Sequence, residues 1–117
     1  MKTLEITENG VTANLTIRHA SVGDDMRRNM LAAQAYESPL ADAPAQAVAA
    51  LIYPRCLACA SGEIDGKPVE GLSAADFSAL PFEIGEAWLT AALELNPRWD
   101  FTRASSAAAD APAQKKD

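Results

Sequence analysis

The sequence predicts an α+β fold, mostly α, in which an N-terminal β-hairpin packs on a small bundle of three to four helices. Three observations support this fold class. The pair Asn9-Gly10 separates two short alternating runs, Lys2–Glu8 and Val11–Arg18, and apolar residues recur at helical spacing from residue 22 onward. The length of 117 residues, 49% of them hydrophobic, suits one domain with a substantial core.

Residues 1–101 form this single domain in our assignment, with the hairpin at 2–18 and the helical body at 21–101. The segment 102–117 is rich in alanine, serine and charged residues. We expect it to be a disordered tail, because it has too few apolar residues to bury.

The register of the hairpin follows from its two-residue turn. Such a turn places Ile6 opposite Ala13 and Leu4 opposite Leu15, so the apolar residues of both strands share one face. The opposite face is polar throughout. An isolated hairpin is marginally stable, so its apolar face must pack on the helical body.

The first helix is predicted at Val22–Tyr36, after Ser21 as its N-cap. Its buried face is predicted from apolar residues at helical spacing: Val22, Met26, Met30 and Ala33. Its outer face is predicted to carry three polar residues: Asp25, Arg28 and Asn29.

A loop is expected at Glu37–Pro44, and a second helix at about Ala43–Ala60. This helix is apolar on nearly all sides, so it is predicted to be buried on several sides or to lie between partners. Pro54 is predicted to kink or end it near Tyr53, because proline lacks the N–H that a helix interior needs.

The second half of the chain is predicted to contain a turn and two helices. Asp65-Gly66 indicates a tight turn and a small second hairpin. Ser73 is a suitable cap for a short helix at Ala74–Leu80, and the last helix begins at Pro81 and ends near Leu95.

The charge balance excludes several classes of partner. The net charge is −6 and no basic run is longer than Arg27-Arg28, so the chain lacks the positive patch that binds nucleic acid or an anionic membrane surface. No stretch approaches the roughly 20 apolar residues of a membrane span, and the N-terminus does not have the pattern of a signal peptide. We expect no nucleic-acid partner, no membrane partner and a cytoplasmic location.

Few residues are suited to catalysis. The chain has one histidine, one local pair of cysteines and no glycine-rich loop, so we expect no enzymatic activity, no small-molecule substrate, no cofactor and no metal. His19 is predicted to have a surface or capping role. Asp24 and Asp25 fit helix capping, and Glu83 and Glu86 fit a solvated polar stripe.

The pair Cys56-x-x-Cys59 has several interpretations. A redox dithiol needs a helix N-terminus, whereas this pair falls in or after a long apolar helix. A zinc site needs four ligands, which His19 does not complete, although two chains could supply both cysteines each. The interpretation that the sequence favours is two small buried residues one helical turn apart.

The last helix carries more apolar surface than one hairpin absorbs. We therefore expect an exposed apolar groove between the second and last helices. Its predicted partner-binding residues are Trp88, Leu89, Ala92 and Ile52, although Trp88 fits a core position equally well. Trp99, Phe101 and Phe82 are predicted to be core residues, as are Met26 and Met30.

The order of elements resembles the small tail assembly chaperones of long-tailed bacteriophages and prophages, in the group that has a β-hairpin ahead of a helical body. The resemblance rests on a pattern that spans about Leu4–Trp99. Its parts are the Asn9-Gly10 hairpin, a strand ending in Thr16-Ile17-Arg18, a helix with Asp24 near its start, an apolar helix, Asp65-Gly66-Lys67-Pro68, Leu72-Ser73-Ala74-Ala75-Asp76-Phe77 and Leu80-Pro81 before a terminal helix.

The resemblance implies a chaperone that binds the tape-measure protein and helps the tail-tube protein to assemble around it in the bacterial host cytoplasm. It implies no catalytic residues. Two alternatives stay open: a self-associating structural component of a tail or virion, and a small redox protein that uses Cys56 and Cys59.

Overall fold

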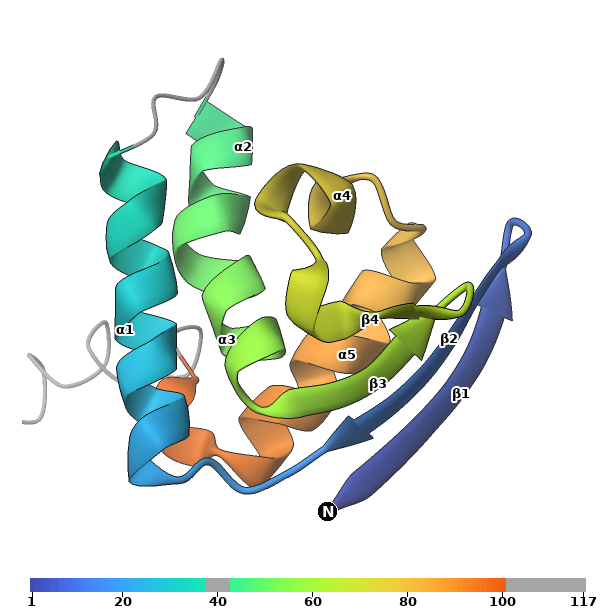
Figure 1. Cartoon of the computed structure of the whole chain (residues 1–117), viewed down its shortest axis with the longest axis horizontal. Helices are drawn as coiled ribbons and strands as arrows, with labels where there is room; N and C mark the ends of the chain where they lie inside the picture. Colours follow the sequence, from blue (N-terminus) through green and yellow to red (C-terminus); the bar gives the residue numbers. More distant parts are fainter. Residues whose placement is uncertain (38–42, 101–117) are drawn as a thin grey trace, which may run out of the picture.

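The structure is a computed structural model of the chain, and it describes residues 1–37 and 43–100 (Figure 1). The elements, in chain order, are β1 (Lys2–Glu8), β2 (Val11–Ile17), α1 (Val22–Glu37), α2 (Ala43–Ala47), the π-helical segment η1 (Val48–Ile52), α3 (Tyr53–Ala58), β3 (Ala60–Ile64), β4 (Lys67–Pro68), the 3₁₀ turn η2 (Val69–Gly71), α4 (Ala74–Ser78), α5 (Phe82–Leu95) and the 3₁₀ turn η3 (Pro97–Trp99). Most of the loop expected at residues 37–44, the predicted core residue Phe101 and the tail expected at 102–117 lie outside the described residues.

The predicted fold class is confirmed: an N-terminal antiparallel hairpin lies against a mostly helical body. β1 and β2 pair in the predicted register, with Leu4 opposite Leu15 and Ile6 opposite Ala13. The apolar face of β2 is fully buried, and α5 packs across β1 and β2 to cover it (Figure 1).

The sheet extends beyond the hairpin, which the sequence did not predict. β3 pairs with β2, and the short β4 completes an antiparallel sheet of order β1-β2-β3-β4. The predicted turn at Asp65-Gly66 joins β3 to β4, and Asp65 also accepts a hydrogen bond from the backbone N–H of Thr12 at 2.8 Å. β2 is therefore paired on both edges.

The second helix continues through Pro54 to Ala58, close to its predicted end at Ala60. Of the two effects predicted for Pro54, a kink or an end near Tyr53, the end does not occur. The segment just before the proline is π-helical, and the N–H of Tyr53 bonds to the carbonyl of Val48, five residues back. A proline ring would collide with the carbonyl four residues before it in a regular α-helix. The wider π turn at η1 makes room for the ring within a continuous helix.

Aromatic residues fill the centre of the core. Trp88 and Phe77 pack edge to face with ring centroids 5.4 Å apart, and Tyr53 packs in the same way on Phe77 at 5.8 Å. The indole N–H of Trp88 donates to the carbonyl of Cys56 at 3.1 Å, so the buried ring leaves no polar atom unsatisfied. Phe82, in contrast, is exposed at the first position of α5, which corrects its assignment to the core.

The short elements before α5 are placed nearly as predicted. The hydroxyl of Ser73 accepts a hydrogen bond from the N–H of Asp76 and caps α4, which ends two residues earlier than expected. The last helix runs from Phe82 to Leu95, with Pro81 as its N-cap.

Gly62 is the glycine on which the sheet most depends. It has φ +120° opposite Leu15, and a Cβ there would overlap the backbone carbonyl of Asn14. We expect Gly62→Ala to lower the free energy of unfolding by about 2 to 4 kcal/mol. Gly85→Ala, in α5 with open space around its Cβ position, is expected to raise it by about 0.5 to 1 kcal/mol. Urea unfolding of both variants checks the pair, and equal effects would contradict the assigned role of Gly62.

Candidate functional site

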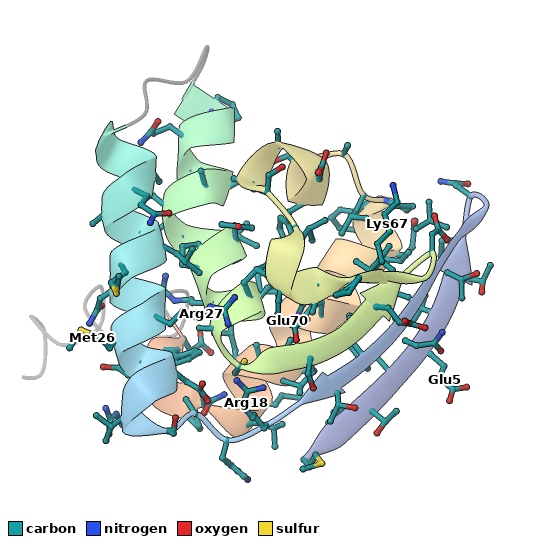
Figure 2. The ribbon with its side chains drawn as sticks, viewed as in Figure 1. Glu5, Arg18, Met26, Arg27, Lys67 and Glu70 are labelled. Carbon is teal, nitrogen blue, oxygen red and sulfur yellow. The ribbon has the colours of Figure 1, made fainter. Side chains whose placement is uncertain are left out.

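α1 exposes the apolar residues that were predicted to be buried, Ala33 included, while Asn29 is exposed as predicted. Val22, Met26 and Met30, predicted to be buried, are 88%, 56% and 57% exposed, and Figure 2 shows Met26 pointing away from the body of the protein. Asp25 and Arg28, predicted to lie on the outer face, are half-buried. The predicted helix is therefore correct in its extent and wrong in its orientation.

An ion pair fixes one side of the α1 N-terminus. Arg18, just after β2, donates to both carboxylate oxygens of Asp24, at 3.0 Å from Nε and 2.8 Å from Nη2. The same guanidinium donates to the carbonyl of Ala58 at the end of α3. The hydrogen bonds from Arg18 hold the pKa of Asp24 below its ordinary value. The pair thus joins α1 to both β2 and α3.

A second group of contacts, the Trp99 cluster (Asp25, Arg28 and Trp99), fixes the other side. The indole N–H of Trp99 donates to Asp25 Oδ1 at 3.0 Å, and Arg28 donates to the same oxygen at 3.1 Å. The Arg28 guanidinium lies over the Trp99 ring, 5.3 Å from its centroid. Trp99 is buried, as predicted, but its contacts with α1 are made with two charged residues, Asp25 and Arg28.

From Val22 to Gln34, these contacts leave one face of α1 uncovered and without an ionisable side chain. The residues that form this exposed α1 face share high exposure and the lack of an ionisable group: Val22, Gly23, Met26, Asn29, Met30, Ala33 and Gln34. A surface helix usually turns charged residues to water. Here the charged residues of the first two turns are half-buried: Asp24, Asp25, Arg27 and Arg28. The exposed face from Val22 to Gln34 therefore has the composition of an interface.

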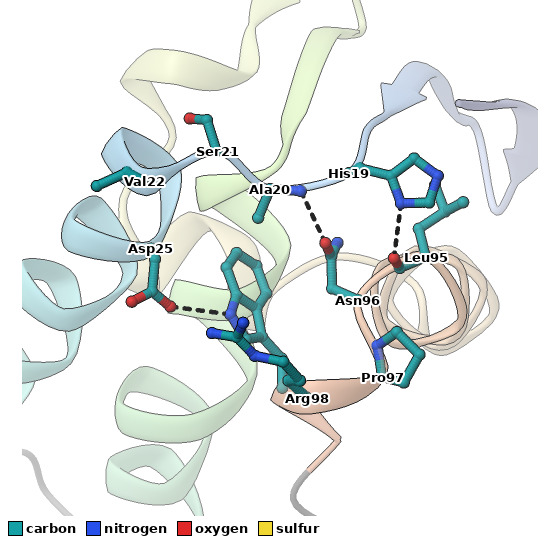
Figure 3. A pocket seen from close by; sticks show the side chains of 10 residues that line it. His19, Ala20, Ser21, Val22, Asp25, Leu95, Asn96, Pro97 and Arg98 are labelled. Atoms are coloured by element: carbon teal, nitrogen blue, oxygen red, sulfur yellow. Dashed lines mark hydrogen bonds between the residues drawn. The ribbon is translucent and has the colours of Figure 1, made fainter.

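A hollow of about 360 Å³ lies at the N-terminal end of this face (Figure 3). Val22 and Asp25 line it on one side, and the end of α5 and η3 line it on the other. His19, for which a surface or capping role was predicted, is exposed and bonds through Nδ1 to the carbonyl of Leu95 at 2.9 Å. The N–H of Ala20 donates to the Asn96 side chain at 2.7 Å. These polar groups hold the walls of the hollow together.

A smaller hollow of about 250 Å³ lies at the other end of the exposed α1 face. Gln34 and Ala35 of α1 line it together with Ala49 and Tyr53 of the second helix. The distance along the helix axis from Val22 to Gln34 is about 18 Å, the rise of twelve helical residues. The exposed α1 face therefore borders a hollow at each end, the first at Val22 and the second at Gln34.

The structure buries two of the four predicted groove residues. Trp88 and Ala92 are fully buried, so they present no surface to a partner, and Leu89 and Ile52 are half-buried against the core. The sequence does contain the signal for the exposed α1 face, the spacing of Val22, Met26 and Met30. Its exposure depends on Arg18 and Trp99, which lie outside the helix.

Cys56 and Cys59 are buried at the end of α3, as the core interpretation predicts. Burial raises the pKa of the Cys56 thiol well above its ordinary value and that of Cys59 to about 11. Both are therefore thiols at neutral pH, which is unfavourable for redox chemistry. Within residues 1–37 and 43–100, no three His, Cys, Asp or Glu side chains are grouped as metal ligands.

Comparison of the chain with known protein families, with curated proteins and with solved structures finds no match in any of the three. Among the described residues, no helix has the length and apolar character needed to cross a membrane.

The Arg18–Asp24 pair predicts a pH-dependent contribution to stability. We expect Asp24→Asn to lower the free energy of unfolding at neutral pH by about 1 to 2 kcal/mol, since the pair is partly screened by solvent. The pKa of Asp24 is lower in the folded chain, so its contribution is present above the ordinary value of 3.8 and is lost as the pH falls below it. Urea unfolding near pH 7 and near pH 2.5 should show the difference shrinking, whereas Glu63→Gln should change little at either pH.

The buried cysteines predict slow reaction with a thiol reagent. At neutral pH, neither Cys56 nor Cys59 should react until denaturant is added, because both are buried and protonated. Ser78→Cys, at an exposed position at the end of α4, supplies an exposed thiol as the control. Rapid labelling of the natural pair in the folded protein would instead favour the redox alternative.

Proposed function

We propose that this chain is a non-enzymatic binding protein that holds an apolar helical segment of another protein. The tail assembly chaperones that its sequence resembles suggest the partner: the tape-measure protein, held in the host cytoplasm until the tail-tube protein assembles around it. The observation that carries the proposal is the exposed α1 face, on which three large apolar residues lie without a charge among them.

The spacing and chemistry of this face suit a helical partner. Val22, Met26 and Met30 follow one another at intervals of four residues, which aligns their side chains along one side of α1. Methionine is flexible and polarisable, so it can adapt to irregular apolar surfaces on a long partner. The hollows beside Val22 and Gln34 offer places for larger anchoring side chains.

The acidic character of the chain supports the same role. A net charge of −6 opposes self-aggregation of a protein that exposes apolar side chains. Two titratable groups that line the hollow beside Val22 are used in contacts within the fold: Asp25 accepts from Trp99, and His19 bonds to the carbonyl of Leu95. These contacts support a binding role in preference to catalysis.

The structural alternative, a self-associating tail component, is favoured by the symmetry of the same face. Two antiparallel copies of α1 would place Met26 opposite Met30 and Gly23 opposite Ala33 of the second copy, a self-complementary arrangement. The small residues would allow the two helices to approach closely. The two functions therefore use one surface and differ in what covers it.

Co-expression with an apolar helical fragment of a tape-measure protein tests the proposal. The natural chain should keep the fragment soluble and copurify with it, whereas the double variant Met26→Glu, Met30→Glu should recover about tenfold less, because two carboxylates would be buried in an apolar contact. Phe82→Glu is the matched control, since Phe82 is an exposed apolar residue on α5, away from α1. Equal recovery by all three proteins would refute the assigned surface.

Light scattering over a concentration series separates the two functions. A monomer that binds a hydrophobic dye through the exposed α1 face supports the chaperone. A stable oligomer that Met26→Glu, Met30→Glu dissociates supports the structural component and counts against the chaperone.

A further inference from the structure

The outer edge of β1 is a second surface without a partner, at the opposite end of the molecule from α1 (Figure 1). β1 is seven residues long, ends the sheet, and pairs with β2 along its whole length without a bulge or a proline. In the part of the chain that the structure describes, no strand pairs with its other edge. Natural proteins usually shorten, bend or cover such an edge.

The register identifies the backbone groups at this edge. In a hairpin with a two-residue turn, the residues beside the turn are a hydrogen-bonded pair, and bonded pairs then alternate along the strands. Glu8 opposite Val11 is that first pair. The N–H and C=O groups of Thr3, Glu5 and Thr7 therefore point away from β2. The same alternation along β2 points the Thr12 carbonyl away from β1 and toward β3. There it accepts a hydrogen bond from the N–H of Asp65 at 2.8 Å.

The surroundings of the edge are acidic. Glu5 is exposed on the polar face of β1, opposite to α5, and Figure 2 shows it pointing away from the molecule. The Nζ of Lys2 lies 2.9 Å from Glu94, which places that side of α5 against β1. The other exposed residues on this side of α5 lie four, eight and eleven positions before Glu94 on one helical face: Thr90, Glu86 and Glu83.

We propose that the edge of β1 binds an extended basic segment of a partner protein by strand addition. The backbone of that segment would bond to Thr3, Glu5 and Thr7. Its lysines or arginines, at alternate positions on the α5 side of the sheet, would face the carboxylates of α5. A second copy of this chain fits the edge poorly, because the register that uses all three residues of both copies sets Glu5 opposite Glu5.

This proposal is independent of the exposed α1 face, and its test uses a defined probe. The probe is a labelled seven-residue peptide in which lysine alternates with valine, and its control carries glutamate in place of lysine. Fluorescence anisotropy with the full chain should show binding of the lysine peptide and at least about tenfold weaker binding of the glutamate peptide, the effect of several partly exposed ion pairs.

Two N-methylated forms of the lysine peptide distinguish strand addition from charge attraction. A strand bonds to an edge through alternate residues only, so methyl groups on one set of alternate N–H groups should abolish binding and those on the other set should leave it intact. Equal binding of both forms would overturn the proposal, as would failure of the unmethylated lysine peptide to bind.

Protein variants locate the site on the chain. Glu83→Gln, Glu86→Gln should weaken binding of the lysine peptide several-fold. The matched control Glu63→Gln, Glu70→Gln removes two exposed carboxylates on and after β3 and should leave binding unchanged. Equal weakening by both pairs would show that the peptide responds only to the net charge of the protein. That result would overturn the assignment of the site to the edge of β1. Met26→Glu, Met30→Glu should bind the peptide normally, so this test does not depend on the chaperone proposal.

Discussion

The orientation of α1 depends on the charged and aromatic groups that hold its first two turns. Arg18 binds Asp24 from the end of β2, and Trp99 binds Asp25 from the end of the described chain. Only further along the helix do apolar residues, beginning with Leu31, pack on the core. Because the inner side of the first two turns is occupied by carboxylates, the methionines face outward. The proposed interface is thus a consequence of how the helix is attached.

Features specified by adjacent residues could be predicted from the sequence. The hairpin register follows from Asn9-Gly10, the cap of α4 from Ser73, and the start of α5 from Pro81. Each of these depends on backbone preferences and on hydrogen bonds within a few residues. The burial of the cysteine pair also followed, because the helix around it is apolar on nearly all sides.

Features specified by distant contacts could not be predicted. Nothing near Ser61 or Gly62 indicates a strand that pairs with β2, since that pairing spans almost fifty residues of sequence. The inward face of α1 resembles a solvent face until Arg18 and Trp99 are known to lie beside it. The candidate site was misplaced for the same reason: Trp88 satisfies its indole N–H on Cys56 in the core and therefore presents no surface.

The contact between Asp25 and Trp99 joins residues 74 positions apart, and this has a consequence for the protein as it is synthesised. At about 5 to 20 residues per second, roughly 4 to 15 s pass between the synthesis of Asp25 and that of Trp99. α1 can form early, but during that interval it lacks the group that determines which side faces the core. During that time the side of α1 that carries Met26 and Met30 can pack on the apolar second helix as it emerges. In the nascent chain, the second helix therefore competes for the α1 face that the finished protein exposes.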